Sequence, residues 1–429
     1  MKQESKQWGA IIVMIALFAM IAFVTNLCSP MGVIVKNQFG TTNFMAMIGN
    51  YGNFGAYLLM GFPAGMMIQR WGYKRTALIG LLVGITGILV QWLSGWGGMA
   101  VYLIGALISG ACMCILNTVV NPMLNLLGGG GNKGNQLIQT GGVFNSTAAV
   151  AVYIIMGALI GDAAKAKISD ATPALMIALA IFVIAFVVIL FTRIDEPQQT
   201  VEVKSGEKDP HSAFSFRHFN LGILAIGLYG GIEMGIPGFV LQYLTSPLDA
   251  ATPGLAMDAG YVGTLSAVYF LLMLIGRFIG ASVGGKVSTK AMMTFVSALA
   301  IILLLLGIYL PTTMTVCVPG IDYVALDFVW GDIPVGIFCF LLVGLCASVM
   351  WGGIFNLATE GLGKYTAIAS GAFMTMVVGF AIMVAIQGLV ADWTGSFLTS
   401  YWVPLACAAY ILYYALWGSK NVNTDIPVE

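Results

Sequence analysis

The first third of this 429-residue chain has no acidic side chain between Glu4 and Asp162, although five long apolar runs lie in that stretch. Over the whole chain 59% of residues are hydrophobic and only 8% are charged. An ionised side chain at the centre of a bilayer costs at least about 2.5 kcal/mol, so membrane-embedded segments exclude it. The pattern therefore predicts an all-α polytopic membrane protein.

The apolar runs have the length of transmembrane helices. A hydrocarbon core about 30 Å thick needs roughly 20 apolar residues per helix. The sequence predicts twelve such spans, at residues 8–35, 44–68, 76–94, 99–127, 136–160, 174–192, 220–244, 259–285, 291–311, 333–358, 367–391 and 399–417.

Basic residues predict the orientation of these spans. Most of the 18 Lys and Arg residues fall in the terminal segments and in the loops that twelve spans place on one side. By the positive-inside rule both termini are expected in the cytoplasm, which places the chain in the inner membrane.

One long polar segment, 193–219, follows span six. We expect it to be a cytoplasmic linker between an N-terminal six-helix bundle, 1–192, and a C-terminal one, 220–429.

Composition also excludes several functions. The formal net charge is zero and no basic patch occurs, which argues against nucleic-acid binding. No nucleophile with a base, nucleotide fingerprint or metal-ligand spacing is present, so we expect no enzyme, no cofactor and no metal. Both histidines, His211 and His218, lie in the linker, which leaves none for a proton relay inside the membrane. The expected partners are a small molecule and the lipid bilayer, and we expect a monomer.

The loop after span two carries a recognisable motif. It runs from Gly65 to Arg75 as GMMIQRWGYKR. This loop resembles the signature G-x-x-x-D-R-x-G-x-K/R-K/R of the major facilitator superfamily. The resemblance implies two six-helix halves and assigns a gating role to Gly65, Arg70, Gly72, Lys74 and Arg75. Gln69 occupies the acidic position, which removes one half of the salt bridge that the family uses at this gate.

Further motifs are similar to those of the branch that contains the fucose, galactose and glucose permeases. They are Asn26-Leu27, Thr42-Asn43-Phe44, Pro63-Ala64-Gly65, Tyr73-Lys74, Asn121-Pro122, Phe144-Asn145-Ser146, Gly276-Arg277-Phe278 with Gly280, and Ile354-Phe355-Asn356-Leu357 with Gly361-Leu362-Gly363. The resemblance implies transport of a sugar, with a fucose:proton symporter as one member of the branch.

Two departures from that branch bear on proton coupling. The fucose permease pattern has N-L-N-D in span one and E-T-A-A-N-P in span four. Here Ser29 and Asn117 stand at the two acidic positions. A hydroxyl and an amide can bond a sugar, but neither takes up a proton near neutral pH. The coupling mechanism of the fucose branch therefore does not carry over.

One carboxylate lies in the middle of a span. Glu233 is about midway along span seven, and Pro237 follows one turn later. We interpret Glu233 as a proton or cation site or a hydroxyl acceptor, with a structural hydrogen bond as the alternative. Pro237 is expected to kink the helix and free a carbonyl beside Glu233. Arg277 in span eight is expected to partner helix ends or Glu360 rather than substrate.

Uncharged polar residues complete the predicted site. A cavity for a neutral polyol needs amide donors and acceptors and an aromatic face. The predicted substrate-binding residues are Asn26, Asn117, Asn121, Asn145, Gln242, Trp351 and Asn356. Amides also hydrogen-bond between helices in membranes, so each has a structural alternative.

The sequence thus predicts a secondary active transporter that imports a sugar or a similar neutral polyol by alternating access, with proton or sodium coupling through Glu233. Three alternatives stay open. The protein could be a facilitated sugar uniporter, an exporter of apolar or cationic solutes, or a receptor that transports nothing.

Overall fold

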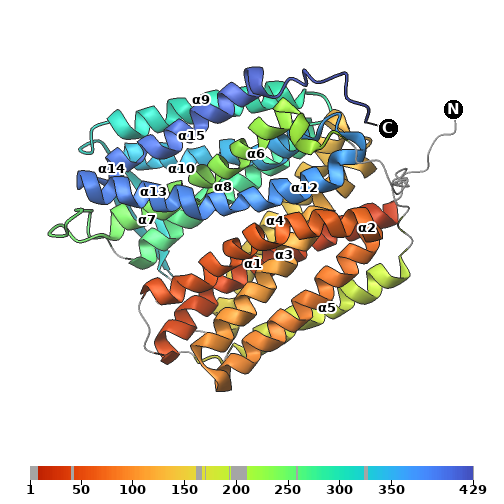
Figure 1. Ribbon diagram of the computed structural model, residues 1–429. Coiled ribbons are helices and arrows are strands. Elements are labelled where there is room, and N and C mark those ends of the chain that lie inside the picture. Colours follow the sequence, from red (N-terminus) through yellow and green to blue (C-terminus); the bar gives the residue numbers. More distant parts are fainter. Residues whose placement is uncertain are drawn as a thin grey trace. The chain divides into compact units, whose positions relative to one another are not determined.

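The computed structural model describes residues 8–39, 43–160, 167–169, 171–192, 194, 210–257, 259–322 and 327–428. Helices dominate it, and each of the twelve predicted spans coincides with helical structure (Figure 1). A backbone in hydrocarbon must satisfy its own hydrogen bonds, which an α-helix does within a single segment. The prediction of twelve transmembrane helices is therefore confirmed.

The first six spans form five continuous helices. These are α1 (Trp8–Phe39), α2 (Asn43–Gly97), α3 (Met99–Leu127), α4 (Gly131–Ile160) and α5 (Thr172–Phe191). Spans two and three share α2, which turns sharply at Gly72 (φ 80°, ψ 173°). This positive φ is strained for a residue with a Cβ, so glycine is the residue that allows the turn.

The last six spans contain several interruptions. Their helical elements are α6 (Arg217–Gly230), η2 (Gly231–Gly235), α7 (Ile236–Thr245), α8 (Ala259–Val283), α9 (Thr289–Tyr309), α10 (Val335–Ala347), α11 (Met350–Thr359), η3 (Gly363–Tyr365), α12 (Thr366–Thr375), η4 (Met376–Val378), α13 (Gly379–Thr394), α14 (Phe397–Ser400), α15 (Trp402–Tyr413) and η5 (Tyr414–Gly418), and the short turn η1 (Ala213–Ser215) precedes them. Span seven is broken by a π-turn at η2, span ten between α10 and α11, and span eleven by the 3-10 turn η4. Only the irregularity in span seven was predicted.

The connection between spans nine and ten is a β-hairpin, which the sequence analysis did not anticipate. Strand β1 (Thr315–Asp322) pairs antiparallel with β2 (Asp327–Pro334), with Thr315 opposite Pro334. The ring of Tyr261 in α8 packs on Gly320 and Gly331, where a Cβ would have no room. The Tyr261 hydroxyl also lies 2.8 Å from the Val318 carbonyl oxygen. These contacts fix the hairpin to α8.

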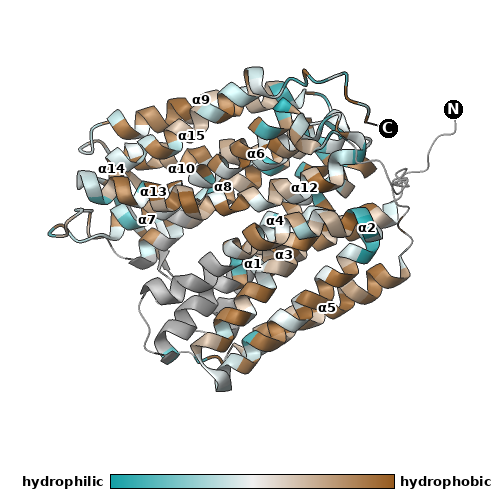
Figure 2. Ribbon diagram, viewed as in Figure 1, coloured by the Kyte–Doolittle hydropathy of each residue, from teal (hydrophilic) through white to brown (hydrophobic). Residues whose placement is uncertain are grey.

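The apolar surface agrees with a membrane environment. Nine helical stretches among the described residues are long and apolar enough to cross a bilayer, and one of them, Asn53–Gly97, covers parts of two predicted spans. Figure 2 shows hydrophobic ribbon along most of α5 and α9. The chain is therefore a multi-pass membrane protein.

The chain divides into two compact units. Unit 1 comprises Met1–Phe219, Thr359–Val378 and Asn421–Glu429, and unit 2 comprises Asn220–Ala358 and Gly379–Lys420. The boundary at Phe219 lies at the end of the predicted linker. The division into two six-helix halves at 193–219 stays a prediction.

Within unit 1, α2 and α12 approach each other closely through small residues. A Cβ on Gly61 would lie 2.7 Å from the Gly371 carbonyl oxygen, and one on Gly65 would lie 2.9 Å from the Ala367 carbonyl oxygen. Ser370 of the same helix donates a hydrogen bond of 3.0 Å to the carbonyl oxygen of Thr118 in α3. Because helices in lipid associate by close packing, small residues are required at this crossing.

Substitution at this crossing should destabilise the protein. Gly61→Val forces a branched side chain against the backbone of α12, and overpacking of this kind costs about 1–3 kcal/mol. We expect a lower midpoint of thermal unfolding in detergent. Gly55→Val is the control within the same helix, because a Cβ at Gly55 meets nothing within 4 Å. Equal midpoints for the two variants would contradict the packing role of Gly61.

Candidate functional site

Glu233 lies at the centre of the π-turn in span seven. Glycines begin and end this turn, at Gly231 and Gly235, and Pro237 follows it without an N–H to continue the α-helical ladder. Buried tyrosines bond the carbonyls nearby. Tyr269 donates to the Ile232 carbonyl oxygen at 2.8 Å, and Tyr401 donates to the Ile236 carbonyl oxygen at 3.2 Å. The predicted break is present, and its form is a π-turn, a feature frequent at functional sites.

Arg277 of α8 faces Glu233. Its Nη2 atom lies 3.9 Å from Glu233 Oε1, within ion-pair range but beyond hydrogen-bonding distance. Its Nε donates to the Ser348 carbonyl oxygen at 3.4 Å, directly after α10. The predicted contact with a helix end is thus confirmed. The acid that the structure places beside Arg277 is Glu233. A contact with Glu360, the alternative to a helix end in the prediction, stays a prediction.

Tyr229 joins the charged pair to a group of aromatic rings. Its hydroxyl donates to the Ala347 carbonyl oxygen at 3.1 Å and interacts with the Glu233 side chain, one helical turn away. Its ring centroid lies 6.4 Å from that of Trp351 and 5.8 Å from that of Phe380. Trp351, predicted as the aromatic face for a sugar, therefore lies beside Tyr229.

The predicted amides of unit 1 all bond protein groups. Asn117 donates to the Tyr57 hydroxyl at 2.8 Å, and Asn121 donates to the Asn117 carbonyl oxygen at 2.9 Å. Asn145 donates to the Phe18 carbonyl oxygen of α1, and Asn26 donates to the carbonyl oxygen of Ala22 within α1. The structure brings Asn117 and Asn121 together. These bonds suit a structural role.

The two remaining predicted residues of unit 2 are Gln242 and Asn356. Gln242 is exposed on α7. Asn356 is buried in α11, and its Oδ1 accepts a hydrogen bond of 3.2 Å from Thr289 at the start of α9. A substrate role for these two residues stays a prediction.

The predicted gating loop is held by one of its basic residues. Lys74 donates to the carbonyl oxygens of Leu190, at 3.0 Å, and Thr192, at 2.8 Å. These carbonyls lie at the end of α5, where a helix has unsatisfied acceptors and favours a cation. Gly65 packs against α12, Gly72 makes the turn, and Arg70 and Arg75 are exposed. Their gating role stays a prediction.

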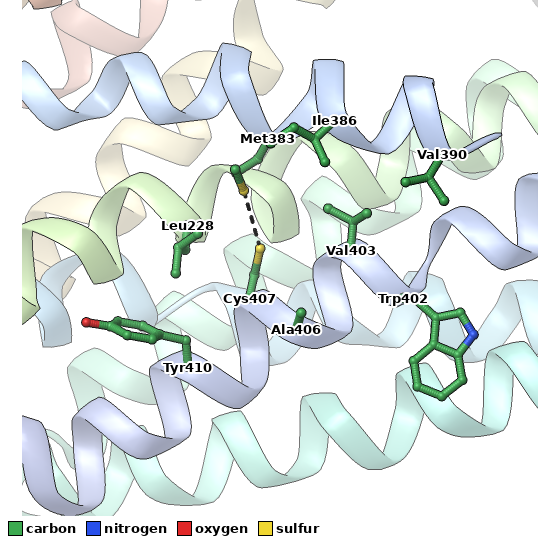
Figure 3. A pocket seen from close by; sticks show the side chains of 9 residues that line it. All are labelled: Leu228, Met383, Ile386, Val390, Trp402, Val403, Ala406, Cys407 and Tyr410. Carbon is green, nitrogen blue, oxygen red and sulfur yellow. Dashed lines mark hydrogen bonds between the residues drawn. The ribbon is translucent and has the colours of Figure 1, made fainter. Parts of the chain in front are cut away.

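A separate hollow in unit 2 is apolar (Figure 3). It has a volume of about 480 Å³ and lies among α6, α13 and α15. Its lining is Leu228, Met383, Ile386, Val390, Trp402, Val403, Ala406, Cys407 and Tyr410. None of these nine is a predicted site residue. A sugar needs several hydrogen-bond partners, so this lining does not suit one.

The Glu233 group combines a carboxyl, a guanidinium and a phenol, which can hold a proton and bond hydroxyl groups. Among the described residues, no group of three or more His, Cys, Asp or Glu side chains could hold a metal ion. The sequence analysis missed Tyr401, Phe380 and the carbonyls of Ala347 and Ser348 at the end of α10. The spacing of Tyr229 and Glu233, four residues apart on a helix, was a usable signal.

Comparisons with known proteins agree with this architecture. The sequence profile of the Major Facilitator Superfamily matches residues 13–386. The chain is 30% identical to a glucose/galactose transporter of Brucella abortus, over 97% of this chain and 96% of that protein. It is 22% identical to the L-fucose-proton symporter of Escherichia coli, over 95% and 92%. Among solved structures, the transporter FucP in the outward conformation matches 96% of this chain and 99% of that chain, with a TM-score of 0.80 and 20% identity.

The tyrosine that holds the π-turn should contribute to stability. Tyr269→Phe keeps the ring but leaves the buried Ile232 carbonyl without its tyrosine donor, a loss of about 1–3 kcal/mol. We expect a lower midpoint of thermal unfolding in detergent. Tyr309→Phe is the control, because Tyr309 is 69% exposed. A midpoint for Tyr269→Phe equal to that of the control would show that this bond contributes nothing.

Proposed function

Because this chain belongs to the major facilitator superfamily, we propose that it imports a sugar by alternating access of two helical halves. Glucose and galactose are the first candidates, since the relative with 30% identity is a glucose/galactose transporter. The proposal includes a monomer in the inner membrane. It places both termini in the cytoplasm, which the distribution of basic residues supports.

The observation that carries the proposal is the grouping of Glu233, Arg277 and Tyr229 beside Trp351. Sugar sites combine charged and amide hydrogen-bonding groups with an aromatic ring that packs on the apolar face of the sugar. Trp351 supplies the ring and Glu233 an acceptor for hydroxyl groups. The unit 1 amides Asn26, Asn117, Asn121 and Asn145, together with Gln242 and Asn356, are the further candidates for contact with the sugar.

We propose that proton binding to Glu233 couples the transport. A carboxylate paired with a guanidinium at 3.9 Å is held without a direct hydrogen bond. Protonation of Glu233 would end its ion pair with Arg277. The guanidinium would then be able to bond the sugar, or would keep only its bond to the Ser348 carbonyl oxygen. The positions that are acidic in the fucose pattern are Ser29 and Asn117 here, so Glu233 takes over the coupling role. Sodium coupling and uniport are the alternatives that the experiments below separate.

Trp351→Leu should weaken sugar binding. The substitution keeps an apolar side chain but removes the ring that would pack on the sugar. We expect KM for galactose or glucose uptake into proteoliposomes to rise by at least about tenfold, which corresponds to about 1.4 kcal/mol, with a smaller change in the maximal rate. An unchanged KM would remove Trp351 from the site.

Glu233→Gln should uncouple transport from the proton gradient. The amide cannot ionise, so proteoliposomes with an imposed pH gradient should no longer accumulate sugar, whereas exchange of labelled for unlabelled sugar should continue. Asp332→Asn, at an exposed acid of β2, is the control and should accumulate sugar as the unmodified protein does.

The outcomes separate the alternatives. Accumulation by Glu233→Gln would defeat the coupling role of Glu233. Sugar movement without accumulation in the unmodified protein, under both pH and sodium gradients, would indicate a uniporter. Failure with every sugar alongside export of lipophilic cations would favour the efflux alternative.

A further inference from the structure

Two donors connect Glu233 to the break in span ten. The Tyr229 hydroxyl donates to the Ala347 carbonyl oxygen at 3.1 Å and also interacts with the Glu233 side chain, one helical turn away. Arg277 pairs with Glu233 through Nη2 and donates through Nε to the Ser348 carbonyl oxygen. Ala347 ends α10, and α11 begins at Met350. The last carbonyls of a helix lack intrahelical partners, so these side chains satisfy acceptors that lipid could not.

The Tyr229 hydroxyl has a single proton, which limits what it can bond at one time. When Glu233 is protonated, its O–H can donate to the Tyr229 oxygen, and Tyr229 can then donate to Ala347. When Glu233 is ionised it can only accept, so the Tyr229 proton is drawn to the carboxylate. The bond to an ionised acceptor is the stronger one. The Ala347 carbonyl then loses its donor.

We propose that Tyr229 is a positioning residue that transmits the protonation state of Glu233 to the end of α10, and so to Trp351 at the start of α11. This inference rests on the proposed coupling role of Glu233. The proton released by Glu233 leaves to water, while the Tyr229 proton stays on its oxygen and changes acceptor. Loss of the Ala347 bond loosens the junction of α10 and α11, which carries the aromatic ring of the proposed sugar site.

Other ionisable groups surround the π-turn. Arg277 and Tyr269 face it from α8, and Tyr269 donates to the Ile232 carbonyl oxygen. Tyr401 donates to Ile236, and Cys407 of α15 packs on Gly231. Cys346 of α10 lies near Tyr269. Of these groups and Tyr229, Arg277 and Tyr229 are the two that contact both the Glu233 side chain and the end of α10 in the described part of unit 2.

The test compares sugar exchange across a series of pH values in proteoliposomes that contain the full-length protein. Tyr229→Phe removes a hydrogen bond that stabilises the ionised carboxylate. The pH at which exchange is half-maximal should therefore move to a more alkaline value by about one unit, a tenfold change in proton affinity. Tyr309→Phe should leave the midpoint in place. In a Glu233→Gln background, Tyr229→Phe should shift nothing.

A second measurement does not depend on transport. The infrared band of the protonated Glu233 carboxyl group is identified by its loss in Glu233→Gln, and Tyr229→Phe should move it to higher frequency because its O–H loses the tyrosine oxygen as acceptor. A uniform loss of rate at every pH with an unmoved midpoint and band would reduce Tyr229 to a structural role and overturn the inference. A shifted band in a protein that moves no sugar would instead defeat the proposed function while leaving the Tyr229 contact in place.

Discussion

A carbonyl group inside a bilayer has no water to bond, and this constraint governs the arrangement of unit 2. Spans seven and ten are both interrupted near mid-length, which frees carbonyls at Ile232, Ile236, Ala347 and Ser348. Each of these accepts a hydrogen bond from the side chain of Tyr269, Tyr401, Tyr229 or Arg277. The polar side chains of the bundle are thus arranged around the irregular backbone, and Glu233 lies where two of them meet.

This arrangement accounts for a carboxyl group that would otherwise be costly in a membrane. The Glu233 side chain keeps 16% of its surface exposed, and its neighbours are a guanidinium and a phenol. In the fucose pattern the acidic positions lie in spans one and four, where this chain has Ser29 and Asn117. Asn117 instead bonds Tyr57 within unit 1.

The sequence was sufficient for the helices and insufficient for their interruptions. The thickness of the bilayer's hydrocarbon core fixes the length of an apolar run that can cross it. The twelve spans therefore follow from the apolar runs along the sequence. Pro237 marked the irregularity in span seven, although it did not distinguish a kink from a π-turn. The break at Ser348 has no proline or glycine to mark it, and donors from α6 and α8 bond its carbonyls.

The β-hairpin offers a practical advantage for structure determination. A 45.4 kDa membrane protein built mostly of helices presents little ordered mass outside its micelle for particle alignment in electron cryomicroscopy. Because Tyr261 packs on Gly320 and Gly331 and bonds the Val318 carbonyl, the paired strands have a defined orientation relative to α8. A small rigid domain inserted between Asp322 and Asp327 would inherit that orientation and serve as a fiducial marker.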